Sequence, residues 1–300
     1  MSLPPETRPA DTGVIHDIGY RGYTGPRLGR AYATRSLFTQ SLRAAYGLGR
    51  SGKSKVLPML VLGVVTTPAV VMVALTLAMS RTDLPVDYPQ YLGSLGLVVS
   101  IFLASQAPVL LSRDLRHHTV PLYFSRPITR GDYVRAKFAA MVCAQLLLMT
   151  APLLVLYIGA LLGGLDFGHH TAHFLYGLVT AVLYALVPTS VALVIAATTP
   201  RRGFGVAAIM GYLAISTTVV AIIVGISSVG SVGIPDSAQW IALLSPNGLV
   251  ESLTNQLFDI GGDFDRMHAP GALGVVAFAA TAGAMVAGSY GLLLRRYRDI

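Results

Sequence analysis

VLPMLVLGVVTTPAVVMVALTLAM, residues 56–79, is the first long apolar run of the chain, and it indicates the class of fold. It contains no Asp, Glu, Lys, Arg or His, and it is long enough to cross the hydrocarbon core of a bilayer, which takes about 20 apolar residues in a helix. Five further runs share both properties: Tyr91–Leu111, Phe138–Leu162, Phe174–Thr199, Phe204–Val232 and Gly271–Leu294. The whole chain is 53% hydrophobic and only 12% charged, with a mean hydropathy of +0.62. We therefore predict an all-α integral membrane protein with six transmembrane helices.

The positive charge lies almost entirely on one side of these six spans. Nine Lys and Arg residues precede the first span, six lie between the second and third, two between the fourth and fifth, and three follow the sixth. Only Arg81 and Arg266 fall on the other side. Cytoplasmic loops of membrane proteins carry the excess of Lys and Arg, so we expect both termini in the cytoplasm. The net charge of +8 then reflects topology and gives no reason to expect nucleic-acid binding.

The chain divides into four expected regions: an irregular cytoplasmic segment (1–30), an amphipathic interfacial helix with a hinge (31–55), the six-span transmembrane domain (56–294) and a cytoplasmic tail (295–300). The interfacial helix is predicted because apolar residues such as Leu37 and Leu42 fall on one half of the helical wheel, while Arg43 falls on the other. We expect this helix to lie among the lipid headgroups. Packing against a soluble partner is the alternative, since it also needs one apolar face.

Two loops are large enough to have structure of their own. The outer loop Gly233–Pro270 contains the apolar stretches Trp240–Leu244 and Leu249–Phe258, which are separated by SPNG. Neither stretch is long enough to span, so we predict a pair of short re-entrant helices in the outer leaflet. On the inner side, the loop Ser112–Arg135 is the one that is large enough to dock a partner.

Residues Gly47–Ser54 read GLGRSGKS and satisfy the phosphate-loop pattern of nucleotide-binding proteins. That loop requires an apolar strand before it and a cytosolic helix after it. Here an amphipathic helical pattern precedes the motif and the first span follows it within a few residues. We therefore interpret the segment as a glycine-rich hinge with basic anchors at the headgroups, and we expect no ATPase site in this chain.

A histidine cluster lies on the opposite side. His169, His170 and His173 follow Asp166 in the predicted outer loop Gly163–His173. Histidines at positions i and i+4 can share a metal ion on one helical face. No second cluster in the sequence completes a coordination sphere, so we favour a solvated, pH-responsive loop and expect no metal site.

The predicted spans contain no ionisable residue, which argues against an ion-coupled transporter or an intramembrane enzyme, because both need buried charged or titratable groups. Uncharged polar side chains do occur in the second and fifth spans. The ones that could line a translocation path are Ser100, Ser105, Gln106, Ser216, Thr217 and Thr218. The alternative for each is a hydrogen bond to its own helix or to a neighbouring helix.

The inner loop carries a family resemblance. Residues Ser112–Phe138 read SRDLRHHTVPLYFSRPITRGDYVRAKF, which is similar to the cytoplasmic loop of type-2 ATP-binding-cassette (ABC) exporter permeases. The positions that carry the similarity are Asp114, Thr119, Leu122, Tyr123, Arg126, Pro127, Arg130, Tyr133 and Lys137. Thr129 followed by Asp132 also forms a potential capping box for the next helix. The six-span layout, with a long outer loop before the last span, resembles the same family.

The resemblance implies a bacterial exporter's membrane subunit without its own catalytic residues or cofactor. Such a subunit pairs with a second copy of itself or a related permease in the plasma membrane, and with separate ATPase subunits that bind ATP and Mg. It further implies that the inner loop forms a coupling helix against the ATPase, with the contact residues Leu122, Tyr123, Arg126, Pro127, Ile128, Thr129 and Arg130. The expected cargo is an amphipathic molecule such as a drug, an antibiotic or a lipid. The alternative is a membrane sensor or scaffold that recruits a cytoplasmic partner without transport.

Overall fold

The computed structural model describes residues 25, 28–49, 51–116, 119–125, 127–229, 233–259 and 267–298. None of these residues belongs to a β-strand. The helices are α1 (Arg30–Ala45), α2 (Gly52–Ala78), α3 (Tyr88–Ser94), α4 (Gly96–Leu110), α5 (Ser112–Arg116), α6 (Val120–Phe124), α7 (Arg130–Leu162), α8 (Phe167–Thr198), α9 (Arg202–Ser227), α10 (Asp236–Gln239), the 3-10 helix η1 (Trp240–Leu244), α11 (Pro246–Phe258) and α12 (Gly271–Arg298). Almost all of the predicted N-terminal segment, Arg126 of the predicted coupling element and the last two residues of the tail lie outside the described residues.

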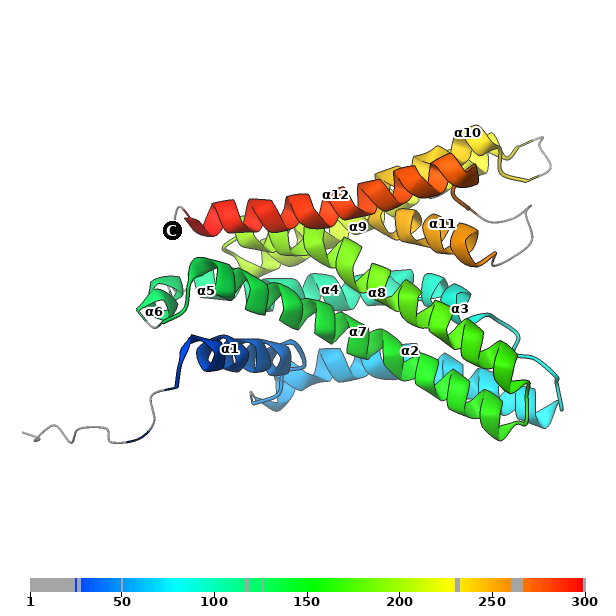
Figure 1. Ribbon diagram of the computed structural model, residues 1–300, viewed down its shortest axis with the longest axis horizontal. Helices are drawn as coiled ribbons and strands as arrows, with labels where there is room; N and C mark the ends of the chain where they lie inside the picture. Colours follow the sequence, from blue (N-terminus) through cyan, green and yellow to red (C-terminus); the bar gives the residue numbers. More distant parts are fainter. Residues whose placement is uncertain are drawn as a thin grey trace, which may run out of the picture.

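Six helices are long and apolar enough to cross a membrane, so the prediction of a six-span, all-α membrane protein is confirmed. They are α2, α4 continued by α5, α7, α8, α9 and α12. The long helices run side by side along the longest axis of the molecule (Figure 1). Helices satisfy their backbone hydrogen bonds internally, which is the requirement for crossing a hydrocarbon core.

Two spans begin well before their predicted first residues. Helix α7 starts at Arg130 instead of Phe138, and α8 starts at Phe167 instead of Phe174. Side-chain caps begin both helices in polar sequence, which hydropathy alone does not detect. The predicted outer loop Gly163–His173 is therefore wrong, because only its first four residues lie outside a helix and the histidine cluster belongs to α8.

The second predicted span, Tyr91–Leu111, is not one continuous helix. It is interrupted at Leu95, between α3 and α4, where Gly93 and Gly96 flank the break. Glycine lowers helix stability at such a position, so the chain can turn there at small cost. Helix α3 thereby becomes a short separate element that packs on α8 and α11.

The two ends of the bundle differ sharply in charge. The start of α1, helices α5 and α6, the α8–α9 turn and the end of α12 share one end (Figure 1). This basic end holds every described Lys and Arg except Arg81, whereas the described acidic residues on it are Asp114 and Asp132. Acidic side chains predominate at the opposite end, which we call the acidic end. The clustering of positive charge expected from the sequence is therefore present in the fold.

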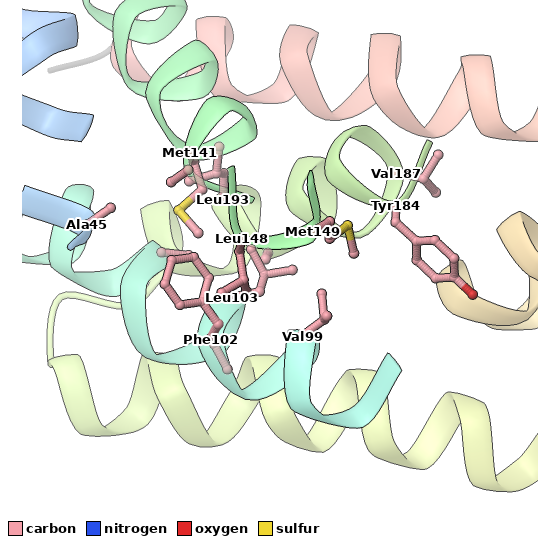
Figure 2. Close-up of a cluster of buried hydrophobic side chains, with 14 of the residues drawn as sticks. Ala45, Val99, Phe102, Leu103, Met141, Leu148, Met149, Tyr184, Val187 and Leu193 are labelled. Atoms are coloured by element: carbon pink, nitrogen blue, oxygen red, sulfur yellow. The ribbon is translucent and has the colours of Figure 1, made fainter. Parts of the chain in front are cut away.

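Helices α4, α7 and α8 form the centre of the bundle. In the most apolar stretch of α4, 72% of the residues are buried, compared with 17% for α9 and for α12. Phe102 and Leu103 of α4 meet Leu148 of α7 and Leu193 of α8 in this core (Figure 2). The peripheral helices α2, α9 and α12 keep a large apolar surface exposed, which suits contact with lipid or another membrane chain.

The amphipathic helix predicted from residue 31 is present as α1, and its apolar face packs on α7 and α4. Leu37 and Ala45 are buried, as the helical wheel predicted, and the Tyr46 hydroxyl donates a hydrogen bond to the Ala144 carbonyl of α7 at 2.7 Å. Arg43 lies on the exposed half. The apolar face of α1 is therefore buried against the rest of the chain. The opposite face of α1 is exposed and is free to contact lipid headgroups or a partner.

The glycine-rich segment Gly47–Ser54 connects α1 to α2 as a turn. Gly47 has a φ of +67°, and a side chain there would overlap the backbone carbonyl of Ser54. The described residues on both sides of the segment are helical, so the strand that a phosphate-binding loop requires is not formed by them. The predicted hinge function of this connection stays a prediction.

Short helices fill the outer connection between α9 and α12. η1 and α11 coincide with the two apolar stretches predicted to be helical, and α10 precedes them. Ser245 begins α11 by accepting a hydrogen bond from the Gly248 backbone at 3.3 Å. Helix α11 packs on α8, α9 and α12, so it belongs to the body of the bundle. Its depth in the outer leaflet stays a prediction.

Candidate functional site

The start of α7 is fixed by a cluster of polar side chains that we call the capping cluster: Arg30, Thr129, Asp132 and Arg135. The Thr129 hydroxyl accepts from the Asp132 backbone at 3.3 Å, and the Asp132 carboxylate accepts from the Thr129 backbone at 3.1 Å. The predicted capping box is therefore confirmed. The Asp132 carboxylate also pairs with Arg135 and with Arg30, the latter at 2.5 Å. Because Arg30 begins α1, the cluster ties α1 to α7.

The contact between Arg30 and Asp132 also affects the ionisation of the arginine. The hydrogen bond to Asp132 raises the pKa of the Arg30 guanidinium, so the arginine stays charged at every physiological pH. Asp132 is 4% exposed in its side chain, whereas Arg30 is 56% exposed. The carboxylate is thus a fixed acceptor and the arginines reach it from the solvent side.

A second polar group joins α5 to α7, and we call it the anchoring network: Asp114, Tyr133 and Lys137. The Asp114 carboxylate accepts from the Tyr133 hydroxyl at 2.9 Å and pairs with the Lys137 ammonium at 2.8 Å. Both charged side chains are largely buried, with 14% and 8% exposure. All three positions belong to the stretch that resembles ABC permeases. The structure therefore gives these positions a common role, which is to hold the inner loop against the body of the bundle.

Aromatic packing extends the anchoring network to α6 and α12. The Tyr133 ring lies 5.6 Å from that of Tyr123 and 6.2 Å from that of Phe124, both on α6. The Tyr297 ring of α12 lies 5.0 Å from it on another side. Tyr133 is fully buried between them. Because ring pairs at these distances are attractive, α6, α7 and α12 are held as one unit at the basic end.

Some of the residues predicted to contact an ATPase are exposed, and others are buried against the bundle. Leu122, Pro127, Thr129 and Arg130 are exposed at the basic end, and Leu122 has 67% of its surface exposed. Tyr123 is partly buried against Tyr133, and Ile128 is buried. Arg126 lies outside the described residues. The described residues of this stretch therefore leave Leu122, Pro127 and Arg130 exposed at the basic end.

A groove separates this surface from α1. It has a volume of about 530 Å³ and is lined by Gln40 and Ser41 of α1 on one side and by Arg113, Asp114 and Thr119 of the inner loop on the other. Polar and charged side chains make up much of its lining. A partner that inserts between α1 and α6 would meet the anchoring network directly.

Apart from the basic end, the bundle contains a cavity of about 400 Å³ between α4 and α9, which we call the α4–α9 cavity. Ser100 of α4 and Thr217 and Thr218 of α9 line it, so the structure brings together three of the six residues proposed for the path. The Ser100 hydroxyl accepts from the Asn247 amide at 3.2 Å, and the Thr217 hydroxyl lies 3.2 Å from that of Ser245. Both partners come from the short outer helices.

The other three predicted path residues do not line this cavity. Ser105 donates to the Phe102 carbonyl, Gln106 donates to Ser105, and Ser216 donates to the Leu213 carbonyl. These contacts match the alternative use of polar side chains within a span, which is a bond to the local helix.

Sequence reasoning missed the polar residues that α11 and α8 contribute to the α4–α9 cavity. Asn247 and Glu251 of α11 line it together with Tyr184 of α8. The Tyr184 ring projects from α8 with its hydroxyl toward α11 (Figure 2). Gly93 lies beside both, because a side chain there would come within 3.7 Å of Glu251 and 3.9 Å of Tyr184. The carboxylate in this cavity therefore comes from α11, outside the six predicted spans.

The signal for those residues was the sequence Ser245–Ser252, SPNGLVES, which interrupts the apolar stretches of the outer loop. Its Asn and Glu are four residues apart, so they share one face of a helix. The sequence matches no protein-family model, and no curated protein is similar to it.

The anchoring network makes a stability prediction. Asp114→Ala removes the acceptor that Lys137 and Tyr133 share, and we expect a loss of about 3 kcal/mol in the free energy of unfolding, as for other buried pairs that lose one partner. Asp114→Ala combined with Lys137→Met should recover part of that loss, because the buried ammonium is then gone too. Denaturation of the purified protein in mixed micelles measures both. Equal losses in the single and the double variant would contradict the assignment.

Proposed function

We propose that this chain is the membrane-spanning permease subunit of an ATP-driven exporter of the type-2 ABC class. In this proposal, a separate ATPase binds ATP and Mg, docks on the basic end and drives an amphipathic substrate outward. The positive charge at that end supports a cytoplasmic location for it and for both termini. The plasma membrane of a bacterium is the location that the resemblance favours.

The observation that carries the proposal is the construction of the inner loop. Its outer face exposes Leu122 and Arg130, while its inner face packs on Tyr133 of α7, which in turn contacts Tyr297 of α12. The Ser112 hydroxyl also donates to the Ala196 carbonyl at the end of α8, at 2.8 Å. A partner that pushes on α6 would therefore move three spans together. Such a rigid-body displacement is a common way to switch a bundle between two states.

The exposed helices suit pairing with a second permease. Large apolar residues such as Phe204, Ile215 and Ile226 of α9 are more than 60% exposed. Helix α9 also forms one wall of the α4–α9 cavity. A second copy of this chain, or a related one, packed near α9 would place the two cavities close to a shared axis. The proposed complex is therefore two permeases and two ATPases.

The cavity favours an amphipathic substrate. Leu97, Met210 and Leu213 give it apolar walls, while Ser100, Asn247 and Glu251 contribute polar atoms at its outer end. Pockets that bind small molecules commonly combine an apolar lining with a few polar groups that orient the ligand. A carboxylate in this position favours substrates that carry a cationic group over anionic ones.

The alternative function is a sensor or scaffold that recruits a cytoplasmic partner without transport. The exposed surface of α6 would serve that role equally well. The α4–α9 cavity favours transport, because a scaffold has no need for polar side chains gathered inside the bundle. The identity of the partner and the effect of filling the cavity therefore distinguish the two.

Charge reversal on the docking surface tests the partner. Arg130→Glu should abolish co-purification of an ABC ATPase with the tagged chain and the associated ATP hydrolysis, because a basic contact becomes acidic. Arg202→Glu is the matched control, since both residues are exposed first residues of helices at the basic end. A glutamate suits the first turn of a helix, so both variants should fold. Absence of an ABC ATPase from the wild-type preparation would overturn the proposal.

Filling the cavity tests transport. Ala214→Trp places a large ring in the α4–α9 cavity, whereas Ala208→Trp on the same helix faces away from it. We expect deletion of the gene to sensitise its host to at least one amphipathic antimicrobial compound. Ala214→Trp should resemble the deletion and Ala208→Trp the wild type, while both retain the ATPase. Full resistance with Ala214→Trp would show that the cavity is not the path.

A further inference from the structure

A cluster of metal-ligand side chains lies at the acidic end, outside the surfaces described above. It consists of Asp87, which precedes α3, and of His169 and His173 in the first turns of α8. One ligand atom from each residue lies within 4.8 Å of the others. The two histidines are four residues apart on one helix face, and Asp87 comes from a distant part of the sequence.

Asp87 is available for this role because it does not cap its own helix. It occupies the N-cap position of α3, where an aspartate usually accepts from the backbone, yet its side chain makes no capping hydrogen bond. Asp166 behaves in the opposite way, since its carboxylate accepts from the His169 backbone at 2.6 Å and begins α8. The aspartate nearest to the histidines in sequence is therefore used as a cap, and the distant one faces the imidazoles.

Asp87 and His173 lie at ion-pair distance but do not form a hydrogen bond with each other. The Asp87 Oδ1 and His173 Nδ1 atoms are 3.1 Å apart. The distance meets the limit for an ion pair, but the directions of the groups do not make a hydrogen bond, and His173 Nδ1 is a buried atom without a hydrogen-bond partner. The in-plane direction of Nδ1, along which its lone pair or N–H lies, therefore does not point at Oδ1. This arrangement fits two ligands around one ion, because the lone pairs of such ligands point at the ion and not at each other.

The packing of α3 on α8 holds these groups together. Gly177 lies one turn beyond His173 on the same face of α8, and a side chain there would come within 2.9 Å of the Tyr88 β-carbon. The Tyr88 hydroxyl also lies 3.3 Å from His170 Nδ1. The start of α3 is thus pressed onto α8, which fixes Asp87 beside the two histidines before any ion binds.

We propose that Asp87, His169 and His173 bind one divalent transition-metal ion of the zinc class. Two imidazoles and one carboxylate are a ligand set of known zinc sites, in which the bonds are about 2.0–2.2 Å long and a further position stays open. Ligand atoms around such an ion are about 3.4 Å apart, so the three ligand atoms, which lie within 4.8 Å of one another, have to approach by at most about 1.4 Å. The partial exposure of all three residues gives the ion a path from the solvent.

The bound ion would cross-link α3 to α8. Because α3 leads into α4, the ion would stiffen the outer approach to the bundle without contributing to its basic end. This inference concerns binding alone and holds whether or not the chain is a permease.

Metal binding is tested on the full chain, purified in detergent with a tag that contains no histidine and stripped with a chelator. Titration with Zn²⁺, followed by elemental analysis, should give about one ion per chain and a rise in melting temperature. Co²⁺ should give the visible absorption of a low-symmetry site with imidazole ligands. Asp87→Asn, His169→Gln and His173→Gln should each weaken Zn²⁺ binding by about tenfold or more.

Asp83→Asn is the matched control. It removes the same charge from the same loop, but Asp83 is exposed and contributes no ligand atom to the cluster. This variant should bind Zn²⁺ like the wild type. Circular dichroism checks that each variant keeps its helices. The inference is overturned if the wild type binds no Zn²⁺, or if the three ligand variants bind it as tightly as Asp83→Asn does.

Discussion

The Asp114 carboxylate accepts from the Tyr133 hydroxyl and pairs with the Lys137 ammonium, and the basic end of the bundle depends on this shared acceptor. A buried lysine is tolerable only when an acceptor faces it. The same contact fixes the Tyr133 ring, on which α6 and α12 pack. Together with the capping cluster, which ties α1 to α7, these contacts hold α1, α6, α7 and α12 together as one unit. A partner that binds the basic end could therefore displace these helices together.

The opposite end is built on a different principle. Short helices fold back against the spans and bring polar side chains into the membrane domain without a charge in any of the predicted apolar runs. Asn247 and Glu251 reach the α4–α9 cavity in this way, from α11. The proposed export function uses both ends, because the α6 surface would receive the partner's motion and the cavity would hold the substrate.

Hydropathy and charge were sufficient to predict the six apolar helices, the amphipathic helix α1 and the helical connection between α9 and α12, because a bilayer constrains length and polarity strongly. The capping box at Thr129 was also predictable, since its pattern is local. Contacts between distant residues were not. Asp87 meets His173 across 86 positions, and Glu251 reaches a cavity between α4 and α9, so only the packing of the helices reveals them. The early starts of α7 and α8 were missed because caps lie outside the apolar runs.

The central claim is that the exposed face of α6 docks on an ATPase. A photo-crosslinking amino acid at Leu122, whose side chain points away from the bundle, tests it directly in the living host. The account predicts that illumination joins the chain to an ABC ATPase, identified by mass spectrometry of the adduct. An adduct with a different class of protein, or with lipid alone, would contradict the account and would favour the sensor or scaffold.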